Sequence, residues 1–210
     1  MTQRFDLHPD NPQSRLLRQA AEILRKGGVI VMPTDASPVL ACRVGERDAL
    51  TRIRAIRGLD DKHLMTLICR DLSELSLYAQ VNTAQFRFVR EWTPGPYTFV
   101  LPATREVPRR LMHPSRRSIG LRVPASDLVS GLIAALGEPL LGTTLQLPGD
   151  ETPIADADEA FARLTRRVDL LIECGVFGSE PTTVIDLTGD APLITRIGKG
   201  EVGGMRLQAD

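Results

Sequence analysis

Short apolar runs alternate with helical patterns along this chain, and the clearest run lies near the N-terminus. Residues 29–32 read Val-Ile-Val-Met, with Gly27-Gly28 before them and Pro33 after them. A short β-branched run between such breakers is typical of a buried strand, which ends at proline because proline has no N–H for a sheet ladder. Thr34 and Asp35 follow at the strand end, where α/β sheets usually bind ligands. A polar turn leaving the core is the simpler alternative.

The same patterns predict elements along the rest of the chain. Apolar runs predict further strands over 65–69, 97–101, 118–123, 139–145, 168–173 and 193–197. Helical spacing of apolar residues predicts helices over 11–26, 48–57, 83–90, 127–136 and 156–167, with a short helix after Asp71. We expect the first of these helices to begin with Asn11 as N-cap and Pro12 as first helical residue.

These elements favour one α/β domain over the whole chain, 1–210, with a core of about residues 14–200. Several connections between strands are too short for helical crossovers. We therefore predict a single twisted sheet of mixed parallel and antiparallel strands, with flanking helices and a concave site. The sequence has neither a Gly-x-Gly-x-x-Gly nor a Walker A motif. Any nucleotide would be held by hydroxyls, backbone amides and arginines.

Composition further narrows the classes of function and the cellular location that we expect for this protein. Lys+Arg and Asp+Glu are both 26, so net charge gives no general attraction to nucleic acid. The three cysteines are far apart and odd in number, which argues for a reducing compartment. Scattered histidines give no zinc pattern, so no metal site is predicted. The sequence shows no apolar run long enough to span a membrane and no signal core at its start, so we expect a cytoplasmic protein.

Two arginines stand out by position. In the strand over 118–123, Ser118, Gly120 and Arg122 alternate with apolar residues and face one way. An arginine in mid-strand is costly to bury unpaired, so Arg122 needs an acidic partner, a ligand or an exposed face. Arg57 lies at a helix end before Gly58, where the helix dipole alone favours a cation.

A basic cluster occupies residues 105–117. Four of its arginines, Arg109, Arg110, Arg116 and Arg117, are candidates to neutralise phosphates of RNA. No aromatic residues interleave them, so a stacking platform for single strands is not indicated. A solvated basic loop explains the same residues.

Several segments, in order, resemble the YrdC/YciO family of threonylcarbamoyl-AMP synthase-like proteins. The resemblance covers nearly the whole chain and is nearest to the YciO branch. It is carried by Pro33-Thr34-Asp35, Pro94-Gly95-Pro96-Tyr97-Thr98-Phe99, Arg122-Val123-Pro124, Thr143-Thr144-Leu145-Gln146, the segment 181–187 and Arg196. The Pro-Gly-Pro turn and Thr98 read as structural, because the turn fixes the strand that packs after it.

The resemblance implies a reaction and a set of site residues. Family synthases condense L-threonine, bicarbonate and ATP, with Mg²⁺, into threonylcarbamoyl-AMP and pyrophosphate, a step toward tRNA modification. Arginines suit such anionic substrates. For threonine the resemblance implies Thr34, Arg122 and Thr182. For the nucleotide it implies Arg57, His63, Ser118, Thr144, Gln146, Thr152 and Arg196, with Arg57, Lys62 and Thr144 as catalytic candidates.

Some positions depart from the family pattern and put the activity in question. Ala55 stands where the family has a lysine, and Pro38 where it has an aromatic residue. Thr144 and Gln146 replace the family's serine and asparagine, so hydrogen-bonding groups remain. The family's next basic or amide position is shifted here by the longer stretch 59–61, which leaves Lys62 or His63 as candidates for it. The sequence thus indicates a threonylcarbamoyl-AMP synthase-like nucleotidyltransferase with an altered site, and leaves open a non-catalytic relative that binds tRNA or double-stranded RNA.

Overall fold

The computed structural model describes residues 1–60 and 63–205. Its helices are α1 Ser14–Arg25, α2 Arg47–Arg57, α3 Leu72–Tyr78, α4 Thr83–Glu91, α5 Asp127–Leu136 and α6 Ala157–Leu164, with a 3-10 turn at Arg109–Leu111. Its strands are β1 Gln3–Asp6, β2 Ile30–Met32, β3 Val39–Arg43, β4 Thr66–Ile68, β5 Tyr97–Pro102, β6 Ser118–Arg122, β7 Leu140–Thr144, β8 Leu170–Glu173, β9 Thr183–Asp186 and β10 Leu193–Arg196.

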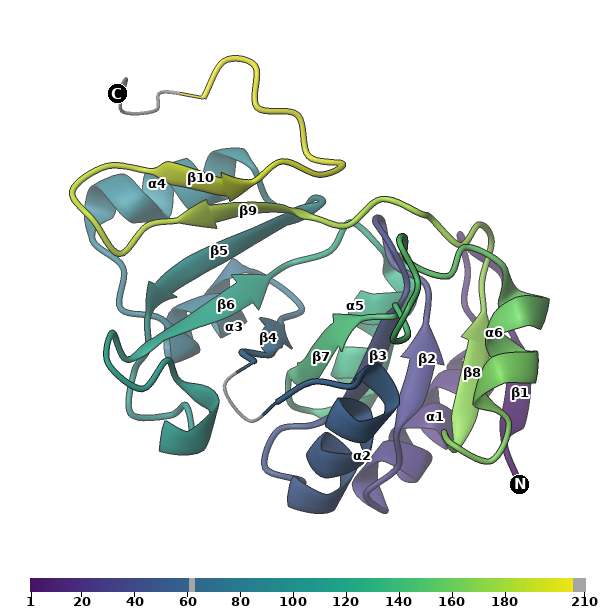
Figure 1. Ribbon diagram of the computed structural model, residues 1–210. Helices are drawn as coiled ribbons and strands as arrows, with labels where there is room; N and C mark the ends of the chain where they lie inside the picture. The colour runs from purple at the N-terminus through teal and green to yellow at the C-terminus, as the bar shows by residue number, and fades with distance from the viewer. Residues whose placement is uncertain (61–62, 206–210) are drawn as a thin grey trace.

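The strands of this part of the chain form one twisted sheet, in the order β1-β8-β2-β3-β7-β4-β6-β5-β9-β10. Parallel pairs such as β4–β6 and β5–β9 alternate with antiparallel pairs such as β3–β7 and β5–β6. The expectation of a single-domain α/β fold with a mixed sheet is confirmed. The edge strands β1 and β10 lie at opposite sides of the molecule (Figure 1). Within the described ranges, no helix is both long and apolar enough to cross a membrane.

The sheet divides the core into two clusters. On one face, α1 and α5 pack on each other and on side chains of β2, β3, β7 and β8. On the other face, α2, α3, α4 and α6 contribute to a larger cluster that includes Phe99 and Leu121. Figure 1 shows α1 and α5 at the half of the sheet that holds β2, β3 and β7. The face that α1 and α5 cover therefore continues beyond them toward β6, β5 and β9.

Strand β6 shows the predicted alternation. Ile119 and Leu121 belong to the larger core cluster, while Gly120 and Arg122 line a cleft on the opposite face. A side chain at Gly120 would meet Thr66 Oγ1 and Thr98 Cγ2, each at 3.3 Å. The glycine thus keeps the floor of the cleft open between β4 and β5.

The structure differs from the sequence-based elements at several places. Helix α1 begins at Ser14, and its N-cap Gln13 makes no side-chain capping bond, so the predicted cap at Asn11-Pro12 is wrong. Strand β3 was not predicted, because Val39–Cys42 is buried on both sides between β2 and β7 and shows no alternation. Strand β1 was also missed, since its short sequence at the sheet edge is mostly exposed.

Candidate functional site

A cleft of about 410 Å³ lies on the sheet face beyond α1 and α5. Ile68 and Val39 belong to the core cluster under these helices and also line the cleft. The cleft therefore lies on the same face of the sheet as α1 and α5. Strands β4, β5, β6, β7, β9 and β10 supply its walls. Its polar lining is Arg57, His63, Thr66, Thr98, Arg116, Arg122, Thr143, Thr144, Gln146, Thr182 and Arg196.

Arg122 lies at the bottom of this cleft and is 4% exposed. Its Nη2 donates to Thr34 Oγ1 at 3.0 Å and to the carboxylate of Asp35. The other carboxylate oxygen of Asp35 accepts from the Ala125 N–H at 2.9 Å. Of the three alternatives that the sequence left for Arg122, an acidic partner, a ligand or an exposed face, the structure shows an acidic partner, Asp35. Burial lowers the pKa of Arg122, and the nearby Asp35 opposes that shift.

A second polar group lies beside Arg122 on the floor of the cleft. The hydroxyls of Thr98 and Thr182 lie 2.8 Å apart and are both buried. Arg196 on β10 donates from Nη2 to Thr182 Oγ1 and from Nε to the Thr182 carbonyl, each at 3.0 Å. Burial also lowers the pKa of Arg196. Residues from three neighbouring strands thus meet at Thr182.

The other end of the cleft is formed by α2 and the end of β7. Arg57 donates from Nη1 to the carbonyl of Gln146, and burial lowers the pKa of its guanidinium. The Gln146 side chain donates to the Asp150 carbonyl at 2.9 Å. His63 lies here too, and burial together with the charge of Arg57 holds the pKa of its imidazole below the usual value. Thr144 completes this end of the lining.

The structure brings together most of the residues that the sequence singled out. Arg57, His63, Arg122, Thr144, Gln146, Thr182 and Arg196 line the cleft directly. Thr34 lies behind Arg122, and Ser118 is fully buried farther along β6, with its hydroxyl unpaired among the described residues. Thr152 is exposed in the loop before α6 and does not reach the cleft. The predicted catalytic Lys62 lies outside the described residues.

Three residues that line or support the cleft were not assigned to it from the sequence. Asp35 was part of the Pro-Thr-acidic motif, and its pairing with Arg122 depends on the fold. Thr98 was interpreted as a packing residue of β5. Arg116 was assigned to RNA, yet it lines the cleft and donates from Nη1 to Asp186 at 2.8 Å. The available signal for Thr98 was its place as the one small polar residue in the predicted strand 97–101, Tyr-Thr-Phe-Val-Leu.

The cleft has an excess of positive charge. Four arginines and His63 line it, and no Asp or Glu of the described ranges does. Several buried donor atoms, including Nε of Arg57 and of Arg122, have no partner in the part of the chain that the structure describes. Buried donors are normally bonded, so unpaired ones need an explanation. An anionic ligand with several acceptor oxygens would provide it. No set of three potential metal ligands occurs within the described ranges.

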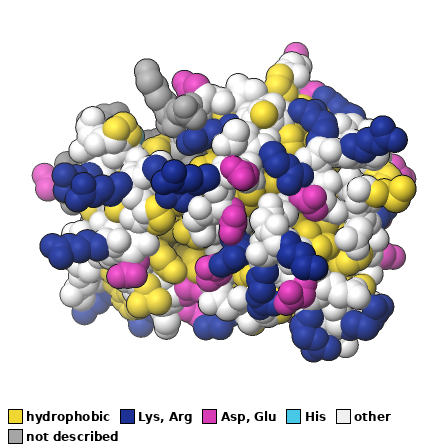
Figure 2. Space-filling view, turned by 90° about the horizontal axis from the view of Figure 1, so that it is seen from below, with side chains coloured by type: hydrophobic (Ala, Val, Ile, Leu, Met, Phe, Trp, Pro, Cys, Tyr) yellow, Lys and Arg dark blue, Asp and Glu magenta, His cyan; other side chains and the backbone are white. Residues whose placement is uncertain are grey.

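The basic loop forms a separate hollow, here called the basic hollow. Arg105, Arg109, His113, Arg116 and Arg117 line it, and Arg116 is shared with the cleft. Arg110 instead donates to the Gly45 carbonyl at 2.8 Å. On the face seen from below, Lys and Arg side chains are interspersed with Asp and Glu (Figure 2). The basic hollow is therefore a local concentration of positive charge on a protein of balanced charge.

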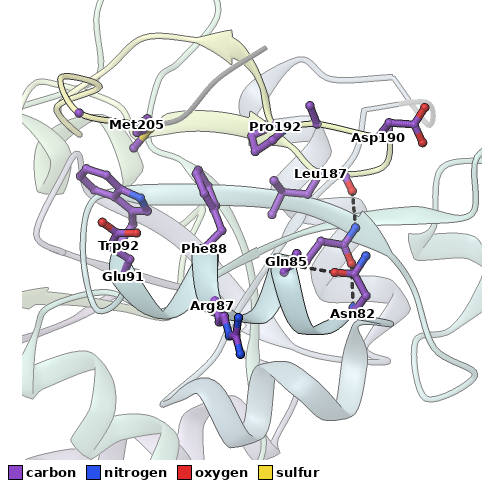
Figure 3. A pocket seen from close by; sticks show the side chains of 14 residues that line it. Asn82, Gln85, Arg87, Phe88, Glu91, Trp92, Leu187, Asp190, Pro192 and Met205 are labelled. Atoms are coloured by element: carbon purple, nitrogen blue, oxygen red, sulfur yellow. Dashed lines mark hydrogen bonds between the residues drawn. The ribbon is translucent and has the colours of Figure 1, made fainter.

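A further hollow of about 630 Å³ lies between α4 and the β9–β10 connection (Figure 3). Phe88, Trp92 and Met205 contribute apolar surface to it. Its amide side chains are bonded within the protein: Asn82 and Gln85 cap α4, and Gln85 donates to the Leu187 carbonyl at 2.8 Å. None of the predicted site residues lines this hollow, so the candidate site is the cleft.

Comparisons with known proteins agree with this architecture. The Sua5/YciO/YrdC family model, described as "Telomere recombination", matches residues 22–198. The chain is 52% identical over 202 residues to YciO of Escherichia coli K12, covering 96% of this chain and 98% of that protein. It is 53% identical over 201 residues to a protein of Haemophilus influenzae, covering 95% of this chain and 97% of that protein.

Solved structures show the same relationship. The crystal structure of E. coli YciO matches with a TM-score of 0.93, covering 97% of this chain and 98% of that chain. The structure of P. abyssi Sua5 complexed with L-threonine matches with a TM-score of 0.84 at 22% identity, covering 94% of this chain and 58% of that chain. The second likeness shows a common fold. From the family match and the identity to YciO, we conclude that the chain belongs to the Sua5/YciO/YrdC family.

Proposed function

We propose that this protein binds ATP and L-threonine in the cleft and catalyses a threonylcarbamoyl-AMP synthase-type reaction with bicarbonate. The observation that carries the proposal is the lining itself: four arginines and several hydroxyls, with no carboxylate among the described lining residues. The triphosphate, the bicarbonate and the threonine carboxylate are all anions. Guanidinium groups bind such oxyanions and keep their charge when partly buried.

The threonine end of the proposed site is at Arg122. Its Nε, which has no partner among the described residues, and the hydroxyl of Thr182 are suited to a carboxylate and a side-chain hydroxyl. The hydroxyl of Thr34 donates to the Ser37 carbonyl and accepts from the Ala36 N–H and from Arg122, so its part in the proposed site is to hold Arg122 in place. Because Asp35 already balances the single charge of Arg122, a substrate carboxylate would be held by a hydrogen bond from the Arg122 Nε–H and by the other cationic groups of the cleft. The structure of P. abyssi Sua5 with L-threonine supports the choice of amino acid through the shared fold.

The nucleotide end of the proposed site is at Arg57, Thr144 and Gln146. Arg57 is held against the Gln146 carbonyl, so its remaining N–H groups are free to donate to phosphate oxygens. Mg²⁺ would bind to ATP, because magnesium is usually held by substrate phosphates and few protein groups. Catalysis in such a site rests on positioning the reactants and stabilising charge.

Product formation tests the proposal. The protein is incubated with ATP, Mg²⁺, L-threonine and bicarbonate, and pyrophosphate and threonylcarbamoyl-AMP are measured. Loss of one charge-assisted contact costs about 1.5–3 kcal/mol, so we expect Arg57→Ala to weaken ATP binding about 10- to 100-fold. Arg18→Ala, at an exposed position on α1, is the matched control. Absence of product, with no binding of ATP or threonine to the unaltered protein, would end the proposal.

The basic hollow supports a second candidate function, binding of tRNA or double-stranded RNA. Arg109, Arg116 and Arg117 face a common hollow with no acidic residue in its described lining. Binding through phosphate contacts should weaken steeply with salt, and removal of Arg109 and Arg117 should reduce that slope. Arg110 is less suited, because its Nη2 is used by Gly45. RNA affinity that ignores both salt and these substitutions would exclude this function.

A further inference from the structure

The loop 113–117 forms one wall of the basic hollow. It follows the 3-10 turn at Arg109–Leu111 and leads into strand β6. His113, Arg116 and Arg117 all line the hollow, and both arginines are exposed. A long exposed side chain loses rotamer freedom when it binds a phosphate, and this loss weakens the contact. The value of these arginines to a ligand therefore depends on how firmly the loop holds them.

Hydrogen bonds of His113 close this loop. The His113 N–H donates to the Ser118 carbonyl at 2.7 Å, and the His113 carbonyl accepts from the Arg117 N–H at 2.8 Å. The imidazole lies inside the turn, where Nδ1 accepts from the N–H of Ser115 at 3.3 Å and from the N–H of Arg116 at 3.1 Å. A neutral imidazole that accepts at Nδ1 has its hydrogen on Nε2. One side chain thus holds the backbone of the turn that carries both arginines.

Arg117 has a backbone conformation that favours glycine. Its φ is 50°, and among the described non-glycine residues only Arg117 and Arg166 have a positive φ. The conformation is held by two backbone bonds, because the Arg117 carbonyl also accepts from the Ala103 N–H at 2.9 Å. Glycine would adopt this φ without steric cost, so the contribution of arginine at this position is its side chain. Such outliers are frequent at binding sites, and this side chain lines the hollow.

Arg116 is held at its guanidinium as well as at its backbone. Its Nη1 donates to Asp186 Oδ2 at 2.8 Å, at the end of β9. The other carboxylate oxygen of Asp186 accepts from the N–H and the hydroxyl of Thr188, at 2.8 and 2.6 Å. Because a guanidinium has five N–H groups, this anchor leaves others for a ligand. Arg116 lines both the cleft and the basic hollow, so a ligand in the hollow would lie next to the cleft.

We propose that the loop 113–117 is a preformed phosphate-binding element for duplex RNA, and that His113 is the positioning residue that directs Arg116 and Arg117 into the hollow. The inference rests on the second candidate function, RNA binding by the basic hollow, and deepens it by identifying what organises the site. Because the loop is already ordered by its own hydrogen bonds, less conformational entropy is lost when a phosphate binds. His113 acts through the backbone of the two arginines.

Substitution of His113 tests the positioning role. His113→Phe keeps an aromatic ring and removes the Nδ1 acceptor, whereas His113→Asn keeps an acceptor, Oδ1, at the corresponding position and lacks Nε2. The probe is an RNA duplex of about 16 base pairs, the length that a double-stranded RNA-binding module spans. We expect His113→Phe to weaken binding about tenfold at physiological salt and to reduce the salt slope by about one to two, because one or two phosphate contacts are lost. His113→Asn should bind within about twofold of the unaltered protein.

His8→Phe is the matched control for these variants. The Nδ1 of His8 accepts from the Asp10 N–H at 3.2 Å, so the substitution removes the same kind of bond from a turn that does not line the hollow. RNA affinity and salt slope should be unchanged in this variant. A loss equal to that of His113→Phe would overturn the positioning role.

A multiple substitution shows whether His113 acts through the arginines. In a protein that already has Arg116→Ala and Arg117→Ala, adding His113→Phe should change RNA affinity by less than about twofold, because the groups that it positions are absent. Arg117→Gly and Arg117→Ala should weaken RNA binding equally. The glycine variant should unfold at a higher urea concentration than the alanine variant, because glycine relieves the positive φ. Circular dichroism of each variant verifies the fold.

The outcomes distinguish failure of the inference from failure of RNA binding. If the unaltered protein binds the duplex and His113→Phe binds it equally well, the inference is overturned and RNA binding stands. Equal losses in His113→Phe and His113→Asn also overturn it, because the acceptor is then not what matters. If His113→Phe does not fold, the Arg117 variants decide, and unchanged RNA affinity in both overturns the inference. Absence of salt-dependent RNA binding by the unaltered protein overturns the inference together with the second candidate function, and the function proposed for the cleft is unaffected.

Discussion

Asp35 and Arg122, 87 residues apart in the chain, form an ion pair at the bottom of the cleft. Their side chains are 11% and 4% exposed, so water screens the pair little. The same carboxylate accepts from the Ala125 N–H, just before α5. One side chain therefore joins the turn after β2, the end of β6 and the start of α5, and it orients the arginine at the bottom of the cleft.

Removing one partner of this pair should cost more stability than removing both. Asp35→Ala leaves a buried guanidinium without its counter-charge, and such a change typically destabilises a fold by about 3–5 kcal/mol. Asp35→Ala combined with Arg122→Met removes the uncompensated charge and should be less destabilising than Asp35→Ala alone. Urea unfolding of Asp35→Ala, Arg122→Met and the double variant measures this. If the free energy of unfolding lost by the double variant equals the sum of the losses in the two single variants, the two side chains are not energetically coupled.

The sequence could predict that Arg122 needs a partner, and the fold was needed to identify it. Alternation in 118–123 showed that Arg122 faces away from the core, and burial cost required a counter-charge. Several acids were eligible, and no local pattern relates residue 122 to residue 35. Only the arrangement of β2, β6 and α5 brings Asp35 to the guanidinium. The motif supplied the candidate residues, and tertiary structure supplied the pairing.

The same limit explains the missed elements. Strand β3 has small or apolar residues on both faces, because it is enclosed by β2 and β7. Such a strand lacks the alternation that reveals a half-buried strand. Thr98 was interpreted as structural, since a threonine in an apolar strand usually packs. Its position in the cleft lining, beside Thr182, depends on the β5–β9 pairing and could not be inferred from the local sequence.

The pH dependence of ATP binding should report on His63. Burial and the charge of Arg57 hold the pKa of free His63 below its usual value. A bound triphosphate adds negative charge nearby and should raise that pKa. Because the complex then binds the proton more tightly, ATP affinity should increase as pH falls through the interval between the bound and free pKa values. A rise of one pKa unit corresponds to about tenfold in affinity.

Calorimetric titration with Mg²⁺ and ATP between pH 5.5 and 8 measures this effect. His63→Asn is the control, because asparagine does not titrate. Protonation of the nucleotide itself affects both proteins equally, so it cancels when the two are compared. The difference between the two proteins should grow toward lower pH and then level off. Parallel curves for both proteins would place His63 away from the phosphates.

The aromatic contacts behind the cleft should be important for stability alone. Phe99 is fully buried on β5, edge-on to Phe88 at 6.4 Å and stacked with Tyr97 at 6.3 Å between ring centroids. Phe99→Ala should destabilise the protein by about 3–5 kcal/mol, because it leaves a cavity in the larger core cluster. Phe99→Leu should cost markedly less. Thermal and urea unfolding measure both, and equal losses would show that ring volume is not what stabilises this region.

Gly120 should control access to the floor of the cleft. A Cβ there would approach Thr66 Oγ1 and Thr98 Cγ2 to 3.3 Å, and the branched side chain of valine would extend into the space between Arg122 and the hydroxyl pair. We expect Gly120→Val to fold, because valine favours strands and the cleft side of β6 is open. Threonine and bicarbonate binding should fall at least tenfold.

Gly137→Ala is the control, in which a side chain strains the backbone and leaves the cleft unchanged. Nothing lies within 4 Å of a Cβ at Gly137, but the φ of 86° at this residue disfavours a side chain. It should lower stability and leave ligand affinity unchanged. Circular dichroism, unfolding and threonine titration separate the two. If Gly120→Val binds threonine and bicarbonate like the unaltered protein, the ligands do not occupy this part of the cleft.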